Sequence, residues 1–359
     1  MRALFHGFGG VQGSCSKHNR AFARCAVEES EVLKLSRRLV FGVPLLALTV
    51  GTTQAPSATQ AFPDKIIRIV VSATAGTPPD IVSRIVDNEL SRVEGWQTVV
   101  ENRPGAMQTM AASEVLKQPA DGLTIMTVSL PSTVAPSLLP AVNFRLDTEF
   151  VPVIRLMTAN HVLVVNPSVP AQSLVDLVAL LKSQPDKLQF SSGGFGTPAH
   201  LAGEAFKLQT GVRAAHVPYS ALPQAIGDLL NGTNHYQFIT PLPVLDLIAT
   251  GKLRALAVTA PNRMPALKDV PTVGEAGFPD LIIQDWVGLV VKAGTPGETV
   301  AILNAAINKA LAQQSVRDAL AKMAAEPGGG TPAEFGNHVK SQTIYWSNVA
   351  KETGLRMHK

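Results

Sequence analysis

Two stretches of this chain share one pattern: an apolar strand, a loop rich in glycine and proline, and a helix that begins at a proline. The first is IVVSATAGTPPD (Ile69–Asp80) and the second is LQFSSGGFGTPAHLAGEAF (Leu188–Phe206). Proline suits a first helical turn because it lacks the N–H group that would find no partner there. The remaining free N–H groups and the helix dipole favour an anion. Two such cradles predict a clamp on a small, carboxylate-bearing ligand.

The distribution of charge along the chain argues against a nucleic-acid partner. The formal charge of +4 comes from the leader, because residues 1–61 hold 7 Lys/Arg against 3 Asp/Glu, while the rest holds 24 of each. A balanced body lacks the basic face that phosphates require, so we expect no nucleic acid. Both cysteines, Cys15 and Cys25, also lie in the leader. The body therefore has neither thiol chemistry nor a disulfide.

The leader has the features of a targeting segment. Arg37 and Arg38 precede the apolar run LVFGVPLLALTV (Leu39–Val50), and small and polar residues follow up to Ala61. This order is typical of a secretory signal peptide, and the run is too short to span a bilayer. We therefore expect cleavage near Ala61 and a soluble protein in the periplasm. A start of translation near residues 32–35 is an alternative explanation of the long first part.

Downstream of the leader, short apolar strands alternate with helical patterns, which is typical of βαβ units and parallel sheets. Two crossings, near His161 and Trp286, divide the mature chain into two lobes. We expect residues 62–160 and 281–359 to form lobe 1, and residues 161–280 to form lobe 2 as an insertion. Pockets form preferentially at domain interfaces, so we expect the ligand between the lobes of a monomer.

The glycine pattern of the second loop, with Gly194 and Gly196, also fits a dinucleotide fingerprint loosely. That interpretation needs an acidic residue at the end of the next strand, and Ala214–Tyr219 contains none. A purely structural glycine turn is the other alternative. The hydroxyl groups of Ser192 and Thr197 at the same place favour the anion cradle.

The remaining candidates have structural interpretations beside the functional ones. Asp80 can simply cap the helix that follows the first loop. His200 lies one turn into a helix, where it can reach a ligand or bond to a neighbouring backbone group. His161 and His216 are expected in strands, as core or interface residues. The sequence has no HExxH or CxxC spacing, nucleophile elbow or Walker loop. We therefore expect no metal, no cofactor and no enzymatic activity.

Ordered motifs along the whole mature chain also resemble a known family. They include VVENRPGA (Val99–Ala106), PADGLT (Pro119–Thr124), KLQFSSGGFGTPAHLAGEAFK (Lys187–Lys207), HVPY (His216–Tyr219) and DVPTVGEAGFPD (Asp269–Asp280). Together they resemble the extracytoplasmic solute receptors of tripartite tricarboxylate transporters, the Bug family. This resemblance implies a two-lobed α/β fold like the type II periplasmic binding proteins. In that fold two mixed or parallel sheets, flanked by helices, close about a hinge on a carboxylate.

The resemblance also implies where the ligand is held and where it is delivered. Contacts fall in the two loops and at three positions outside them. The expected ligand-binding residues are Ser72, Thr74, Gly76, Asp80, Ser129, Ser192, Gly194, Gly196, Thr197, His200, Tyr219 and Thr240. The implied partners are a small organic acid and the membrane subunits of a tripartite transporter. A ligand sensor for a two-component system is the alternative, and an enzymatic or non-binding derivative of the fold is a further one.

Departures from the usual family sequence bear on the ligand. The family usually reads PFPPGGxxD in the first loop, whereas this chain reads SATAGTPPD and has Thr77 in place of the second glycine. After ENRPGA the family tends to continue with Gly-Gly-Asn, where this chain has Met107, Gln108 and Thr109. Added side-chain bulk predicts a bulkier, more apolar ligand, such as an aromatic or chlorinated aromatic acid. We expect the second loop to hold the shared carboxylate and the first to determine what is particular to this ligand.

Overall fold

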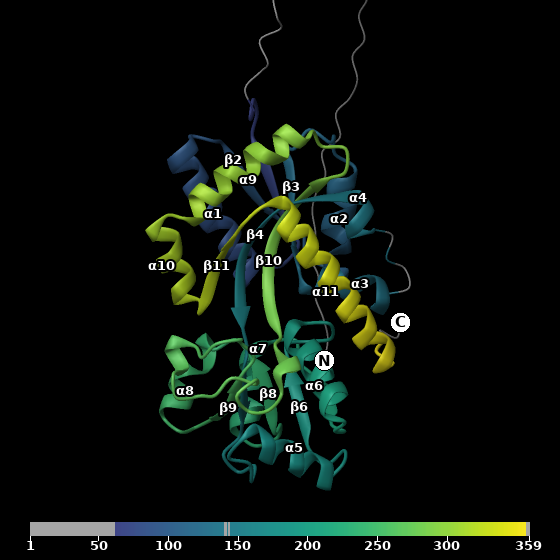
Figure 1. The fold of residues 1–359 in the computed structure, drawn as a ribbon, viewed down its shortest axis with the longest axis vertical. Helices are drawn as coiled ribbons and strands as arrows, with labels where there is room; N and C mark the ends of the chain where they lie inside the picture. Colours follow the sequence, from purple (N-terminus) through teal and green to yellow (C-terminus); the bar gives the residue numbers. More distant parts are fainter. Residues whose placement is uncertain (1–61, 140–141, 143, 357–359) are drawn as a thin grey trace, which may run out of the picture. The chain divides into compact units, whose positions relative to one another are not determined.

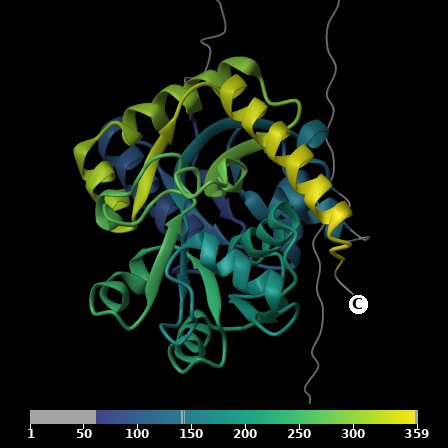
Figure 2. The same ribbon diagram turned by 60° about the horizontal axis from the view of Figure 1, so that its bottom comes forward.

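The computed structural model describes residues 62–139, 142 and 144–356, so the predicted signal peptide lies outside the described residues. The strands form two sheets, a six-stranded one in the order β11-β4-β10-β3-β1-β2 and a five-stranded one in the order β7-β6-β8-β5-β9. Both sheets contain parallel and antiparallel pairs. Helices flank both (Figures 1 and 2). The predicted α/β class with two mixed sheets is confirmed.

The six-stranded sheet is built from both ends of the described chain. Its strands are β1 (Ile67–Val71), β2 (Thr98–Asn102), β3 (Thr124–Ser129), β4 (Phe150–Asn160), β10 (Gln284–Lys292) and β11 (Ala325–Gly329). The helices of these parts are η1 (Ala106–Gln108), α1 (Pro78–Glu94), α2 (Thr109–Leu116), α3 (Leu130–Leu138), α4 (Leu146–Glu149), α9 (Gly297–Leu311), α10 (Gln314–Lys322) and α11 (Pro332–Glu352). Strand β1 is parallel to β2 and β3, whereas β10 is antiparallel to β3 and β4.

The five-stranded sheet is built from the middle of the chain. Its strands are β5 (Val162–Val165), β6 (Gln189–Ser192), β7 (Ala215–Pro218), β8 (Tyr236–Ile239) and β9 (Arg254–Val258). Its helices are α5 (Leu174–Ser183), α6 (Pro198–Thr210), α7 (Leu222–Leu230) and α8 (Leu245–Ala249), with the short turns η2 (Leu242–Val244), η3 (Pro265–Leu267) and η4 (Pro279–Leu281). Strand β6 is parallel to β7 and β8, and β5 is antiparallel to β8 and β9.

The chain passes between the two sheets twice, and the two crossings are neighbours (Figure 1). Strand β4 ends at Asn160, and His161 alone separates it from β5. The return runs through Ile283, whose backbone N–H donates to the carbonyl of Thr259 at 3.2 Å. At this point the side-chain amide of Gln284 donates to Asn160 Oδ1 at 2.8 Å. Two short, adjacent crossings are the geometry that a hinge between two lobes requires.

Local sequence signals explain where several helices begin and end. Helix α5 begins behind Ser173, whose side chain accepts an N–H of the first turn. Helix α11 begins with a capping box made by Thr331 and Glu334. Helices α1 and α6 end at Gly95 and Gly211, both in the left-handed conformation that glycine adopts without strain. These signals determine where the helices next to the β1–α1 and β6–α6 loops begin and end.

The packed interior explains one close approach in the six-stranded sheet. Gly288 of β10 lies under α11, and a Cβ atom at this position would be 2.1 Å from Cζ of Phe335. Trp286 and Trp346, on β10 and α11, are buried in the same cluster. Because core atoms are close-packed, only glycine permits this contact.

None of the described helices has the combined length and apolar character needed to cross a membrane.

Helices α2, α3 and α4 and strand β11 are not among the elements that the sequence pattern predicts, and two of them show why. Strand β11 reads AEPGG, a composition that is poor in strand formers, yet it pairs with β4 at the edge of the sheet. Helix α3 contains Pro131 in its first turn and Pro136 inside. The proline of the edge strand and Pro131 in a first turn remove no bond that the structure needs, whereas Pro136 removes one backbone bond inside α3. Tertiary packing therefore decides these two segments against their local propensity.

Candidate ligand-binding site

A cavity of about 500 Å³ is lined by residues from both parts of the described chain. Six of the residues expected to bind the ligand line this cavity: Ser72, Thr74, Ser129, Gly196, Thr197 and Thr240. The other six do not line it: Gly76, Asp80, Ser192, Gly194, His200 and Tyr219. The sequence thus located both loops, and the structure separates residues at the cavity surface from residues behind it.

Apolar side chains make up much of the lining. They include Pro78, Pro79, Pro104, Pro131, Phe195, Leu222, Phe238 and Ile239. Among the described residues no lysine and no arginine lines the cavity. An anion in this cavity could pair only with backbone N–H groups, hydroxyls and side-chain amides among the described lining residues, which form a predominantly apolar small-molecule pocket with a few polar groups.

The loop between β6 and α6 meets the requirements of an anion cradle. Gly194 and Gly196 have φ angles of 126° and 74°, which glycine adopts readily. The hydroxyl of Thr197 donates to the carbonyl of Gly194 at 2.7 Å and closes the loop. Pro198 and Ala199, in the first turn of α6, line the cavity, and this turn contains no acidic residue. The first N–H groups of the helix are thus available to an anion.

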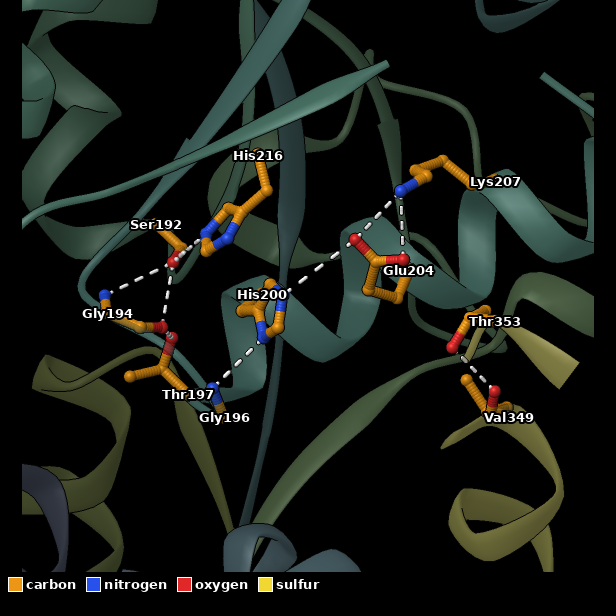
Figure 3. A network of polar contacts seen from close by, with 10 residues as sticks. All are labelled: Ser192, Gly194, Gly196, Thr197, His200, Glu204, Lys207, His216, Val349 and Thr353. Carbon is orange, nitrogen blue, oxygen red and sulfur yellow. Dashed lines mark hydrogen bonds and ion pairs between the residues drawn. The ribbon is translucent and has the colours of Figure 1, made fainter. Parts of the chain in front are cut away.

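A buried polar network holds this loop from behind (Figure 3). Nδ1 of His200 accepts the N–H of Gly196 at 3.0 Å, and Nε2 of His216 lies 2.7 Å from Oγ of Ser192. The two imidazole rings stack with centroids 4.0 Å apart. Burial lowers the pKa of His200 to about 3 and that of His216 to about 4. Both rings are therefore neutral at pH 7, and they position the loop without lining the cavity.

The loop between β1 and α1 is closed by a carboxylate. Asp80 is 3% exposed and accepts hydrogen bonds from the Gly76 N–H at 2.9 Å, from Asn102 Nδ2 at 2.9 Å and from Arg84 Nε at 3.0 Å. Burial alone raises the pKa of Asp80, but the bonds from Arg84, Gly76 and Asn102 outweigh it and hold this pKa below its usual value. Asp80 is thus ionised and fixes the loop. The three groups that donate to it are already engaged.

Tyr219 also has its polar group engaged away from the cavity. Its hydroxyl donates to Oδ2 of Asp228 at 2.6 Å and accepts from Nδ2 of Asn234 at 2.6 Å. These partners lie at the end of α7 and just before β8. The side chain ties the segment after β7 to its neighbours.

The cavity also has lining residues that the sequence analysis did not propose as ligand contacts: Met107, Gln108, His161, Gln237 and Asp285. Met107 and Gln108 have φ angles of 51° and 76°, a conformation that disfavours residues with a side chain. The family tends to have two glycines at these positions, and this departure was a signal that could have indicated both residues. Gln237 had a signal too, because it is a polar residue within an otherwise apolar strand, YQFI.

The two ionisable groups that line the cavity are perturbed by burial. Burial raises the pKa of Asp285 to about 7, although the N–H of Trp286 donates to this carboxyl at 2.9 Å. Burial lowers the pKa of His161 to about 4, so its ring is neutral at pH 7. Within the described part of the chain, no group of three or more His, Cys, Asp or Glu side chains is placed to hold a metal ion.

Comparison with known proteins connects this geometry to a family. The family model described as "Tripartite tricarboxylate transporter family receptor", TctC, matches residues 82–355. A protein from the tcbD–tcbE intergenic region of Pseudomonas sp. strain P51 is 33% identical over 330 residues, which cover 92% of this chain and 98% of the relative. Protein BugT of Bordetella pertussis is 31% identical over 322 residues, with coverage of 89% and 98%.

Solved structures agree with these matches. Rpa4515 of Rhodopseudomonas palustris, solved with adipate, is 32% identical with a TM-score of 0.71, covering 82% of this chain and 100% of that one. MatC of the same organism, with bound malate, is 29% identical with a TM-score of 0.69, covering 80% and 99%. The periplasmic binding protein BugD is 26% identical with a TM-score of 0.69, covering 82% and 100%. The chain therefore has the fold of a periplasmic binding protein and belongs to the TctC family, the receptors of tripartite tricarboxylate transporters.

Proposed function

We propose that this protein is a periplasmic receptor that captures one small organic acid between its two lobes and delivers it to the membrane subunits of a tripartite transporter. It acts as a monomer, after removal of a signal peptide that ends near Ala61. The observation that carries this proposal is the cavity of about 500 Å³ beside the open first turn of α6. The family of this chain is described as one of receptors, so the proposal assigns the protein no catalytic step.

The ligand that fits this cavity is a bulky or aromatic carboxylate. The apolar lining, with Pro131, Phe195 and Leu222 among its members, favours a hydrophobic body over a compact polyanion. The absence of lysine and arginine from the described lining points the same way. Adipate and malate, which are bound in two solved relatives, show that relatives of this chain take small carboxylates.

Of the twelve expected residues, the six that line the cavity contact the ligand directly in this proposal. Gly196 and Thr197 belong to the carboxylate cradle, and Ser72, Thr74, Ser129 and Thr240 surround the body of the ligand. The other six position the loops. A ligand that touches both lobes stabilises their closed arrangement by its differential affinity for it, and the closed form docks on the membrane subunits.

Calorimetric titration of the purified protein tests the proposal. The panel consists of aromatic acids such as benzoate and 4-chlorobenzoate and of compact polyanions such as citrate and malate. We expect saturable binding of aromatic acids at one site per monomer. Tight binding of citrate or malate, without any binding of aromatic acids, would contradict the proposed ligand class. Turnover of a bound acid would contradict the assignment as a receptor.

A further inference from the structure

Outside the two loops, the cavity lining includes the hydroxyls of Ser129 and Thr240 and four further side chains with hydrogen-bond acceptors: Gln108, His161, Gln237 and Asp285. Three of these four are almost fully buried, with exposures of 5% for Gln108, 3% for His161 and 0% for Gln237. Oε1 of Gln108, Nδ1 of His161 and both amide atoms of Gln237 have no hydrogen-bond partner among the described residues. A buried polar atom without a partner is costly, so such a cluster is expected where a ligand provides the partners.

Most of these atoms can only accept a hydrogen bond. Gln108 uses its amide N–H on Oγ of Ser129, which leaves its Oε1 as a bare acceptor. The ring of His161 bonds to the backbone of Ile283, so Nδ1 is the acceptor nitrogen of a neutral imidazole. Burial raises the pKa of Asp285 to about 7, so its carboxyl is ionised above this pH and then offers acceptors only. Nε2 of Gln237 is a donor, but it stands among three unpartnered acceptors, so the cluster favours a ligand group that mainly donates.

Backbone strain provides an independent observation at the same place. Met107 and Gln108 are both left-handed, with φ angles of 51° and 76°. Residues with a side chain avoid this conformation, and such strain is found mostly at functional sites. Met107 lies against the carboxylate cradle, because a Cβ atom on Gly196 would be 2.8 Å from its Cε. The strained turn thus places Gln108 at the cavity and Met107 at the opposite loop.

The charges of the lining disfavour a second carboxylate. Within the described residues no lysine or arginine lines the cavity, and Asp285 is its one acidic side chain. Asp285 is paired across the sheet with Ala159, two residues before His161, so both groups lie at the crossings between the sheets. A dicarboxylate reaching this end would meet a carboxyl group and no cation, which is unfavourable at low dielectric.

We propose that the ligand is a monocarboxylate whose far end carries a hydrogen-bond donor, an amino or hydroxyl group, recognised by Asp285, His161, Gln108 and Gln237. This inference rests on the proposed function, because it takes the binding of one carboxylate as given. The donor pairs with the acceptors that the protein leaves unpaired. The residue set makes this receptor select against the dicarboxylates that its solved relatives hold.

A matched series of six-carbon acids tests the inference, with protein expressed from the full-length sequence and purified as the cell processes it. The four probes are hexanoate, 6-hydroxyhexanoate, 6-aminohexanoate and adipate, and a parallel aromatic series is benzoate, 4-(hydroxymethyl)benzoate, 4-(aminomethyl)benzoate and terephthalate. By calorimetry we expect at least one donor-bearing acid to bind about tenfold tighter than the plain acid, the effect of one good charge-assisted hydrogen bond. A preference for the amino over the hydroxyl compound identifies an ammonium as the donor.

The variant Asp285→Asn separates recognition from folding. This substitution removes the charge and keeps the shape of the side chain. We expect the ratio of affinities between the amino-bearing acid and the plain acid to fall below about threefold. The matched control is Asp280→Asn, an exposed aspartate that does not line the cavity. Burial disfavours the ionised form of Asp285, so Asp285→Asn is expected to unfold no more readily than the natural protein above pH 7.

The possible outcomes distinguish this inference from the function on which it rests. Adipate or terephthalate binding as tightly as the donor-bearing acids overturns the inference and leaves a carboxylate receptor. Equal binding of the plain and donor-bearing acids does the same. An unchanged preference in Asp285→Asn removes Asp285 from the recognition set. If no acid of either series binds, the proposed function fails and the inference fails with it.

Discussion

The two strand–loop–helix segments look alike in sequence, yet they offer an anion very different surroundings. Helix α6 begins with a single proline, so Ala199 and His200 present free N–H groups in a turn without acidic residues. Helix α1 begins with Pro78 and Pro79, which have no N–H groups, and the next residue is the ionised Asp80. A helix N-terminus attracts an anion only if its donors are free and its dipole is not already matched by a carboxylate.

The two loops therefore offer a ligand two different environments. The β6–α6 loop is held from behind by the neutral imidazole of His200, which leaves the front of the loop uncharged. The β1–α1 loop is held by Asp80, whose ionised carboxylate is paired with Arg84 and already occupies the helix N-terminus that a ligand carboxylate would need. This supports the prediction that the second loop binds the carboxylate while the first contacts the rest of the ligand.

The largest expected effect comes from one methyl group added to each loop. Gly196 and Gly76 both have positive φ angles, 74° and 79°, so alanine strains both equally. Gly196 lines the cavity, and its new Cβ would lie 2.8 Å from Cε of Met107 and push the end of that side chain aside at the cradle, whereas at Gly76, which does not line the cavity, the new Cβ meets nothing within 4 Å. We expect Gly196→Ala to weaken ligand binding about a hundredfold and Gly76→Ala by less than about fivefold.

Calorimetric titration of both variants with one tight ligand checks this difference. Thermal unfolding serves as the control, because the shared backbone strain should lower both melting temperatures by similar amounts. Equal losses of affinity in the two variants would remove the distinction between the loops.

Acid should loosen the two loops at different pH. The folded protein lowers the pKa of His200 to about 3, from about 6.5 in the unfolded chain. Between these values the unfolded state binds more protons, so the stability from His200 is complete above pH 6.5 and is lost as the pH falls. From pH 7 to pH 5 this amounts to about 2 kcal/mol for one histidine. We expect His200→Gln to lose that much less stability over this range than the natural protein.

Guanidinium unfolding at pH 7, 6 and 5 measures the difference, and Asp80→Asn is the matched control in the other loop. The pKa of Asp80 is held below its usual value, so this carboxylate stays ionised throughout the range. Its replacement should shift the stability by a constant amount at all three pH values. Parallel curves for His200→Gln and the natural protein would show that the imidazole does not carry the acid sensitivity.

The sequence was sufficient for most of the elements and for the two loops, because alternating apolar runs and Gly/Pro breaks are local signals. It was insufficient for the role of each polar side chain. Asp80 and Tyr219 are satisfied by Asn102 and Asn234, partners that only the folded chain brings close. Asp285 gave no local sign, since its place at the cavity comes from the pairing of β10 with β4. Strand β11 was not predicted, because its pairing with β4 outweighs the low strand propensity of its proline and glycines.

The smallest expected effect compares two threonines that make the same bond. Thr77 and Thr197 precede α1 and α6, both line the cavity, and their hydroxyls donate to the carbonyls of Thr74 and Gly194 at 2.6 and 2.7 Å. Valine removes each bond at nearly equal volume, a change of about 1 kcal/mol in loop order. If only the β6–α6 loop holds the carboxylate, Thr197→Val should weaken binding about fivefold and Thr77→Val less than twofold in calorimetry. A larger loss in Thr77→Val would place the carboxylate at α1 and reverse the comparison.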